Sequence, residues 1–129
     1  MNLFFTILGD PRTKKNSSRI VTTKKGHAFL IPSKQYKEYE KSFCQQAKSQ
    51  CVSGLKIDEK VNIKCIYYMR THRKVDLTNL LSATMDCLVS AGVIEDDNSK
   101  IAAANDGSRV RYDKESPRVE ITISSLLDE

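Results

Sequence analysis

The stretch Arg73-Lys74-Val75-Asp76-Leu77-Thr78-Asn79-Leu80-Leu81 opens a segment that closes, one helix length later, at Glu95-Asp96-Asp97-Asn98. From Leu77 onward apolar residues recur at steps of three and one, which predicts a helix with a wide apolar stripe. Gly92 is placed to terminate that helix. Acidic side chains therefore flank a predicted helix, and whether they bind metal or only cap and turn the chain decides the function.

Periodicity predicts the other elements on both sides of this helix. Alternating apolar residues predict a strand over 60–69, and three- and four-residue spacing predicts an amphipathic helix over 34–51, with Ser33 as its N-cap. Upstream, a strand over 3–8 and a hairpin pairing 19–23 with 27–31 are expected. Downstream, strands are expected at 99–104, 110–112 and 118–123. The sequence thus predicts an α+β fold, with two main helices packed on a mixed β-sheet and residues 1–129 forming a single domain.

Composition restricts the class of protein. The chain has 129 residues, enough for one domain with one core, and no apolar run approaches the ~20 residues of a membrane span. The N-terminal residues resemble a first strand rather than a signal peptide, so a cytoplasmic location is expected. Cys44, Cys51, Cys65 and Cys87 form no CxxC pair, a spacing that does not predict a zinc site.

Charge is divided unevenly along the chain. Residues 1–75 carry 16 Lys and Arg against 5 Asp and Glu, whereas residues 76–129 carry 5 against 11. A basic half and an acidic half in one small domain indicate a polyanion-binding surface beside an acidic pocket. The alternative is that these charges lie on ordinary solvated faces.

The acidic positions have two interpretations. Hard divalent cations take oxygen ligands, and one or two such ions can activate water for phosphodiester hydrolysis, with Lys or Arg holding the phosphate. Equally, Asp76 is a good N-cap, Asp96-Asp97-Asn98 suits a turn, and Asp86 fits a solvent-facing position. The pattern alone leaves both interpretations open.

Ordered motifs extend over nearly the whole chain. They are the Pro-basic segment at 9–16, Ser-x-x-Tyr-x-x-Tyr at 33–39, R-x-x-D-x-x-N-L at 73–80, a helical Asp86, and Gly-Val-Ile-Glu-Asp-Asp at 92–97. In this order and spacing the chain resembles the RusA-like family of Holliday-junction resolvases, small endodeoxyribonucleases of phages and prophages. The resemblance implies a homodimer that binds four-way DNA junctions and makes paired nicks with Mg²⁺ or Mn²⁺, in recombination or repair, with no membrane and no small-molecule cofactor.

The resemblance also implies roles for particular residues. Asp76 and Asp97 are expected to be the central metal ligands, Asp86 and Asp96 to assist them, and Asn79 to orient the site. Contacts to the DNA backbone, which read junction shape with strong salt dependence, are expected from a basic set. That set is Lys14, Lys15, Arg19, Arg70, Arg73 and Lys74.

The chain departs from the family pattern at two positions. Thr78 replaces the second aspartate of the usual D-x-D-N, and Ser82 replaces a lysine four residues further on. Three outcomes follow: Asp86 or Asp96 completes the site with Asn79, metal binds more loosely through waters, or DNA is bound with little cleavage. The first is preferred because four aspartates remain. Lys14, Lys15 or Arg73 could replace the lysine, and the sequence does not choose among them.

Two other functions are compatible with the same residues. One is a non-catalytic module of the same fold that binds junctions, motivated by Thr78 and Ser82. The other is a structural or regulatory protein whose carboxylates only cap helices and form turns.

Overall fold

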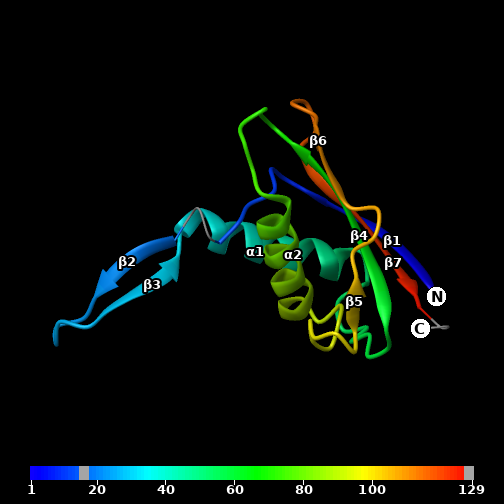
Figure 1. Cartoon of the computed structure of the whole chain (residues 1–129), viewed down its shortest axis with the longest axis horizontal. Coiled ribbons are helices and arrows are strands. Elements are labelled where there is room, and N and C mark those ends of the chain that lie inside the picture. Colours follow the sequence, from blue (N-terminus) through cyan, green and yellow to red (C-terminus); the bar gives the residue numbers. More distant parts are fainter. Residues whose placement is uncertain (15–17, 127–129) are drawn as a thin grey trace.

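A mixed β-sheet carries both helices on one face and leaves the other face open (Figure 1). The computed structural model describes residues 1–14 and 18–126, without the side chains of 18–21 and 29–32. In chain order the elements are β1 (Asn2–Leu8), β2 (Ser18–Thr22), β3 (Ala28–Pro32), α1 (Lys34–Ser49), β4 (Val61–Met69), α2 (Leu77–Ser90), β5 (Ala102–Ala104), β6 (Arg109–Tyr112) and β7 (Arg118–Ser125).

The strand β7 lies inside the sheet, between β1 and β4. It is antiparallel to both neighbours, with Ile121 opposite Phe5 on one side and opposite Cys65 on the other. The strands β5 and β6 both pair with β4 in parallel, which makes the sheet mixed. Side chains along β4 and β7 alternate between buried and half-buried, because successive residues of a strand point to opposite faces.

The hydrophobic core fills the space between the sheet and the two helices. Apolar burial of this kind is the main favourable contribution to folding. The largest side chains with almost no exposure come from the strands, from both helices and from the segment after α2. They include Ile7, Tyr36, Phe43, Ile63, Tyr67, Leu80, Leu88, Ile94, Ile121 and Ile123.

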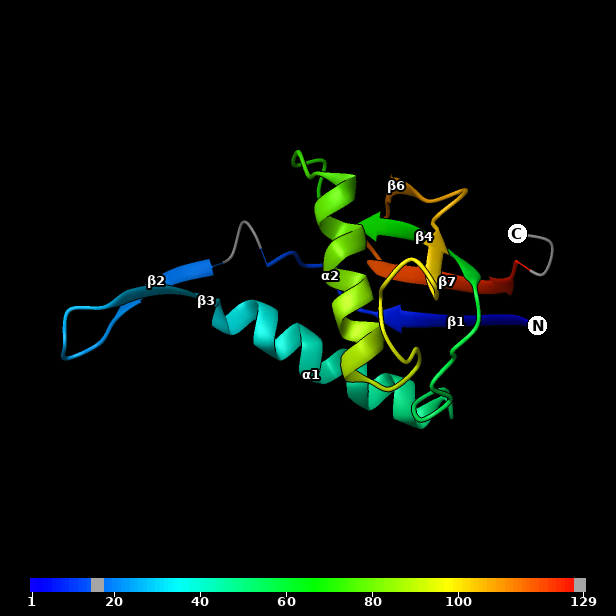
Figure 2. The ribbon, with the colours of Figure 1, turned by 60° about the horizontal axis from the view of Figure 1, so that its bottom comes forward.

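The hairpin of β2 and β3 stands away from this body as a separate two-stranded sheet (Figures 1 and 2). Its strands pair from Ser18–Pro32 to Thr22–Ala28, and its turn is closed by a hydrogen bond from the Gly26 amide to the Thr23 carbonyl. The predicted hairpin is therefore confirmed, but it adds no strand to the main sheet.

Local chemistry sets the ends of both helices. The Ser33 hydroxyl accepts a hydrogen bond from the Tyr36 amide, as its N-cap role predicts. The helix α2 ends before Gly92, whose φ of +72° is costly for residues other than glycine. A Cβ at this position would also approach the Gly54 backbone nitrogen to 3.2 Å. Gly92 therefore allows both the turn and this close packing.

The predicted α+β fold is confirmed, with small differences at element ends. The first helix ends at Ser49 rather than at residue 51, and Cys51 has a left-handed φ of 60°. Residues 99–101 form a turn instead of the start of a strand, because Asn98 accepts backbone hydrogen bonds from Lys100 and Ile101. In the part of the chain that the structure describes, no helix is long and apolar enough to span a membrane.

Candidate functional site

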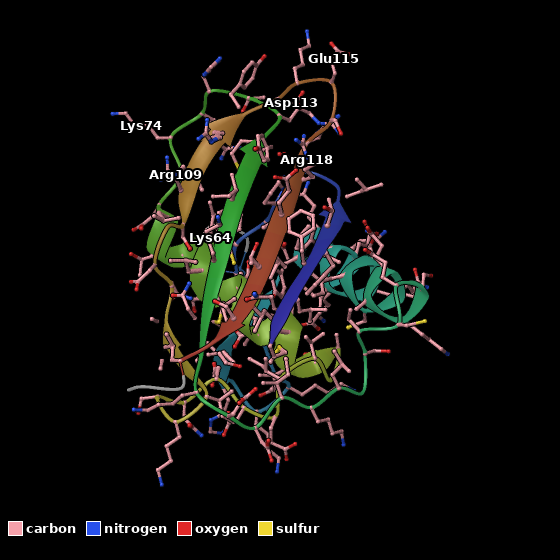
Figure 3. The ribbon with its side chains drawn as sticks, turned by 90° about the vertical axis from the view of Figure 1, so that its right-hand side faces the viewer. Lys64, Lys74, Arg109, Asp113, Glu115 and Arg118 are labelled. Atoms are coloured by element: carbon pink, nitrogen blue, oxygen red, sulfur yellow. The ribbon has the colours of Figure 1, made fainter. Side chains whose placement is uncertain are left out.

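The basic loop between β4 and α2, residues 70–76, is held at both sides. The Arg70 amide donates a 2.9 Å hydrogen bond to Asp10 Oδ1, which ties the loop to the segment after β1. On the other side the His72 ring stacks on Tyr112, with centroids 3.7 Å apart. Arg70, Arg73 and Lys74 are exposed on this loop, and Figure 3 shows Lys74 extending away from the sheet. The loop therefore presents cations to solvent from a fixed backbone.

Asp76 lies at the end of this loop and caps α2. Its Oδ1 accepts a 2.9 Å hydrogen bond from the Thr78 amide, and the residue is exposed. A capping carboxylate uses one oxygen for the helix, so its second oxygen still has lone pairs for another partner. Capping and ligand roles are thus compatible at Asp76.

A pocket of about 330 Å³ lies beside the loop. It is half open to solvent and is bounded by the segment after β1, the first turn of α1, the end of β4 and the basic loop. The lining residues are Asp10, Pro11, Arg12, Thr13, Gln35, Met69, Thr71, Arg73, Lys74 and Val75. Three cations and one carboxylate make its wall net positive, which favours an anionic ligand.

Lys14 contacts the middle of α2 from a distant part of the sequence. Its Nζ lies 3.0 Å from Asp86 Oδ2 and 5.5 Å from the centre of the Tyr36 ring. Asp86 lies one helical turn beyond Ser82, so the ammonium group reaches the face of α2 that carries Ser82. This ion pair is about two-fifths exposed, and Asp86 is already neutralised by a cation.

Asp96 and Asp97 follow the opposite end of α2. Asp96 uses both carboxylate oxygens locally, accepting from the Asp97 amide at 2.8 Å and from Asn98 Nδ2 at 3.2 Å. The segment before them is fixed by a bridge between Ile94 and Ile57. The Asp97 side chain is exposed.

The length of α2 bears on whether the acids before and after it can bind one metal ion. Fourteen helical residues rise about 20 Å, so Asp76 caps one end of α2 and the chain that leads to Asp97 leaves from the other end. Oxygens that share one Mg²⁺ lie within about 4 Å of each other, since each is about 2.1 Å from the ion. Among the described residues, no three His, Cys, Asp or Glu side chains gather into a possible metal site. The described part of a single copy therefore does not bring three of these acids to one ion.

The open face of the sheet carries a separate ionic cluster (Figure 3). The Arg118 guanidinium lies 3.9 Å from the centre of the Tyr68 ring and donates hydrogen bonds to Asp113 and Glu120. The hydrogen bond from Arg118 lowers the pKa of Asp113 below its ordinary value. This cluster braces the end of β7 and lies on the face opposite α2.

Two buried thiols lie in the core, Cys65 on β4 and Cys87 on α2. Desolvation by burial raises the pKa of both Cys65 and Cys87 to about 12. Cys87 Sγ lies 3.6 Å from the Tyr36 hydroxyl oxygen. Both thiols stay protonated at neutral pH, which suits core packing rather than nucleophilic chemistry.

The structure brings together part of the predicted site. Arg70, Arg73, Lys74 and Asp76 share one loop, and Lys14 contacts Asp86, whereas Asp96 and Asp97 follow the C-terminal end of α2. Lys15 lies outside the described residues, and Arg19 lies on β2 without a described side chain. Asp10, Arg12 and Gln35 also lie at this site. No site role is predicted for them from the sequence, although they fall within the motifs at 9–16 and 33–39.

A comparison with protein-family models identifies the family of this chain. The family model described as Endodeoxyribonuclease RusA matches residues 9–124. The match includes the basic loop and the four aspartates predicted as site residues, Asp76, Asp86, Asp96 and Asp97. A search of curated proteins gave no match. The matched region covers most of the length of the chain, and the chain therefore belongs to the RusA family of endodeoxyribonucleases.

Proposed function

We propose that this protein is a metal-dependent endonuclease that cuts phosphodiester bonds in branched DNA, including Holliday junctions, by paired nicking. The observation that carries the proposal is the family match over residues 9–124, together with a fixed basic loop that leads directly into Asp76. We further propose that the chain acts as a homodimer with Mg²⁺ or Mn²⁺ in the cytoplasm, in recombination or repair.

The exposed cations give the DNA-binding part of the proposal. Arg70, Arg73 and Lys74 lie on the loop before Asp76, and Arg12 lies across the adjacent pocket. Cations on a fixed backbone can contact successive phosphates, which supplies affinity without reading sequence. Binding is therefore expected to weaken steeply as salt rises.

The separation of the acids supports a homodimer. A two-fold axis across the middle of α2 would set two copies of the helix antiparallel, so that Asp76 of one copy approaches Asp97 of the other. Leu77, Leu81 and Val89 of α2 are half-buried against the core of their own copy, and we propose that their exposed parts provide apolar surface for such a contact. The site that one chain lacks would then form twice in the dimer.

Metal binding is proposed at this composite site. Asp76 from one copy, with Asp96 and Asp97 from the second, would offer carboxylate oxygens to the ion, and Asn79 would lie on the next turn of α2. Thr78 contributes only a neutral hydroxyl where the family has a carboxylate. The ion, when bound, would supply water activation and charge neutralisation at the phosphate. Lys14, held at Asp86, is proposed to replace the cation missing at Ser82.

A second candidate is a junction-binding protein of the same fold that does not cut. It is favoured by the absence of gathered acids among the described residues of one copy and by the neutral Thr78. This candidate keeps the basic loop and its salt dependence but predicts no nicking with any divalent metal.

Mixing two inactive variants tests the composite site. Asp76→Asn and Asp97→Asn are each expected to abolish nicking of a synthetic four-way junction in Mg²⁺. In a mixed dimer one site carries both substitutions and the other carries neither. Random exchange of subunits should therefore restore roughly a quarter of the wild-type sites, since half of the dimers are mixed and each has one intact site.

The nicking pattern distinguishes a composite site from a site within one chain and from a protein that does not cut. Restored activity should appear as single nicks rather than paired nicks, because a mixed dimer has one working site. If each site belonged to one chain, the mixture would stay inactive. If wild-type protein binds the junction but never nicks it, the non-cutting candidate holds. A mixture of Asp76→Asn with Asp76→Ala is the matched control and should show no recovery.

A further inference from the structure

The pocket beside the basic loop combines two kinds of surface. Pro11, Met69 and Val75 give it apolar walls, while Arg12, Arg73 and Lys74 bring positive charge. Gln35 and Thr71 add neutral groups that can donate and accept hydrogen bonds. Such a lining suits a ligand that has a flat, largely apolar ring next to an anionic group.

The size of the pocket limits its ligand. A volume of about 330 Å³ lies at the lower end of the range for small-molecule sites. It can take one nucleotide but not a base pair. A base within a duplex is stacked and paired, so it can enter a pocket of the protein only after it leaves the stack.

We propose that this pocket takes one unstacked nucleotide of a DNA strand, with its base against Met69 and Val75 and its phosphates near the cations. This inference rests on the proposed function and deepens it, because it names what distinguishes branched DNA from duplex. Strands at a branch point change partners there, so a nucleotide leaves the stack at lower cost than inside a duplex.

The position of the pocket links capture to cutting. Val75 lines the pocket and directly precedes Asp76, the N-cap of α2. The loop that carries both is fixed by the Asp10–Arg70 hydrogen bond and by the His72–Tyr112 stack. A nucleotide held in the pocket therefore places its neighbouring phosphate at the carboxylate end of the loop.

Binding without catalysis tests the inference. Fluorescence anisotropy, in buffer without divalent metal, would compare a short oligothymidine with an abasic oligomer of the same length and charge. Wild-type protein is expected to bind the oligothymidine about tenfold more tightly than the abasic oligomer. This difference in affinity is the one expected when a single base packs against the protein. The same ratio is expected between an intact junction and one with abasic sites at its branch point.

Filling the pocket provides the matched variants. Gln35→Trp places a large ring at the pocket wall from an exposed position in the first turn of α1, and it should lower oligothymidine affinity to the abasic level. Gln45→Trp changes an exposed glutamine of the same helix that does not line the pocket, and it should bind as wild type does. Thr71→Trp fills the pocket from the loop if the first variant does not fold.

Equal affinity of wild-type protein for the oligothymidine and the abasic oligomer would overturn the inference. So would unchanged binding by both pocket-filling variants. Failure of the proposed function is measured differently, as no preference for a junction over duplex DNA or no nicking with metal. The wild-type comparison with abasic DNA does not depend on either result.

Discussion

Asp76 has an observed role as the N-cap of α2 and a proposed role as a metal ligand, and two substitutions can separate these roles. The carboxylate caps α2 through a 2.9 Å hydrogen bond from the Thr78 amide. Asparagine is as good an N-cap as aspartate because its side-chain oxygen accepts the same bond. Alanine offers no acceptor. Asp76→Asn should therefore remove the charged ligand and keep the cap, whereas Asp76→Ala should remove both.

The expected magnitudes follow from the fold. Loss of the cap in Asp76→Ala should lower the free energy of unfolding by about 1 kcal/mol. For 129 residues this is a fall in Tm of about 4 °C. Asp76→Asn should change stability by less than about 0.5 kcal/mol, since only the interaction of the charge with the helix dipole is lost. Both variants should nick a junction at least about 100-fold more slowly, since loss even of groups that only orient a ligand costs 10–100-fold.

The assay pairs thermal unfolding with nicking of a labelled four-way junction under single-turnover conditions. The decisive comparison is Asp76→Asn against wild type. Wild-type nicking by Asp76→Asn, together with a lower Tm for Asp76→Ala, would show that the carboxylate is only a cap. The proposed metal role of Asp76 would then be wrong.

Three further changes follow from contacts in the structure. Lys14→Met removes the 3.0 Å pair with Asp86, which is partly exposed, so stability should change by less than about 1 kcal/mol while nicking falls; an unchanged nicking rate would exclude Lys14 as the replacement cation. Tyr67→Phe deletes a buried 2.7 Å hydrogen bond to a threonine hydroxyl of α2 and should cost about 1 kcal/mol in urea unfolding, with DNA affinity unchanged. Arg118 lowers the pKa of Asp113, so this pair stabilises the fold above the unfolded-state pKa of about 3.9 and loses that contribution as pH falls through the lower folded-state pKa. The stability difference between wild type and Asp113→Asn should therefore shrink in urea unfolding below about pH 4, and a constant difference would contradict the assignment.

Local patterns were enough to predict the elements because each carries its own signal. The spacing from Leu77 to Leu88 predicts α2, and the alternation from Val61 to Tyr67 predicts β4. Gly92 ends α2 as predicted, since its left-handed φ suits glycine. These signals lie within a few residues of the structure that they determine.

The site was harder to predict because its relations are long-range. The contact of Lys14 with Asp86 joins residues far apart in sequence, and no local pattern selects Lys14 over other basic residues. The separation of Asp76 from Asp97 depends on α2 remaining one straight element between them. The acidic motif is compact in sequence, but its two parts follow the opposite ends of a helix that rises about 20 Å.

The interior position of β7 has a consequence for how the chain folds during synthesis. Until residues 118–125 have left the ribosome, β1 and β4 lack their shared neighbour, and each exposes an unpaired strand edge. Pairing Leu3 with Ile123 closes a loop of nearly the whole chain, which predicts slow folding. Unpaired edges on an incomplete chain favour aggregation. Chains that stop before Arg118 should therefore accumulate as insoluble protein, however intact their basic loop and acidic helix ends remain.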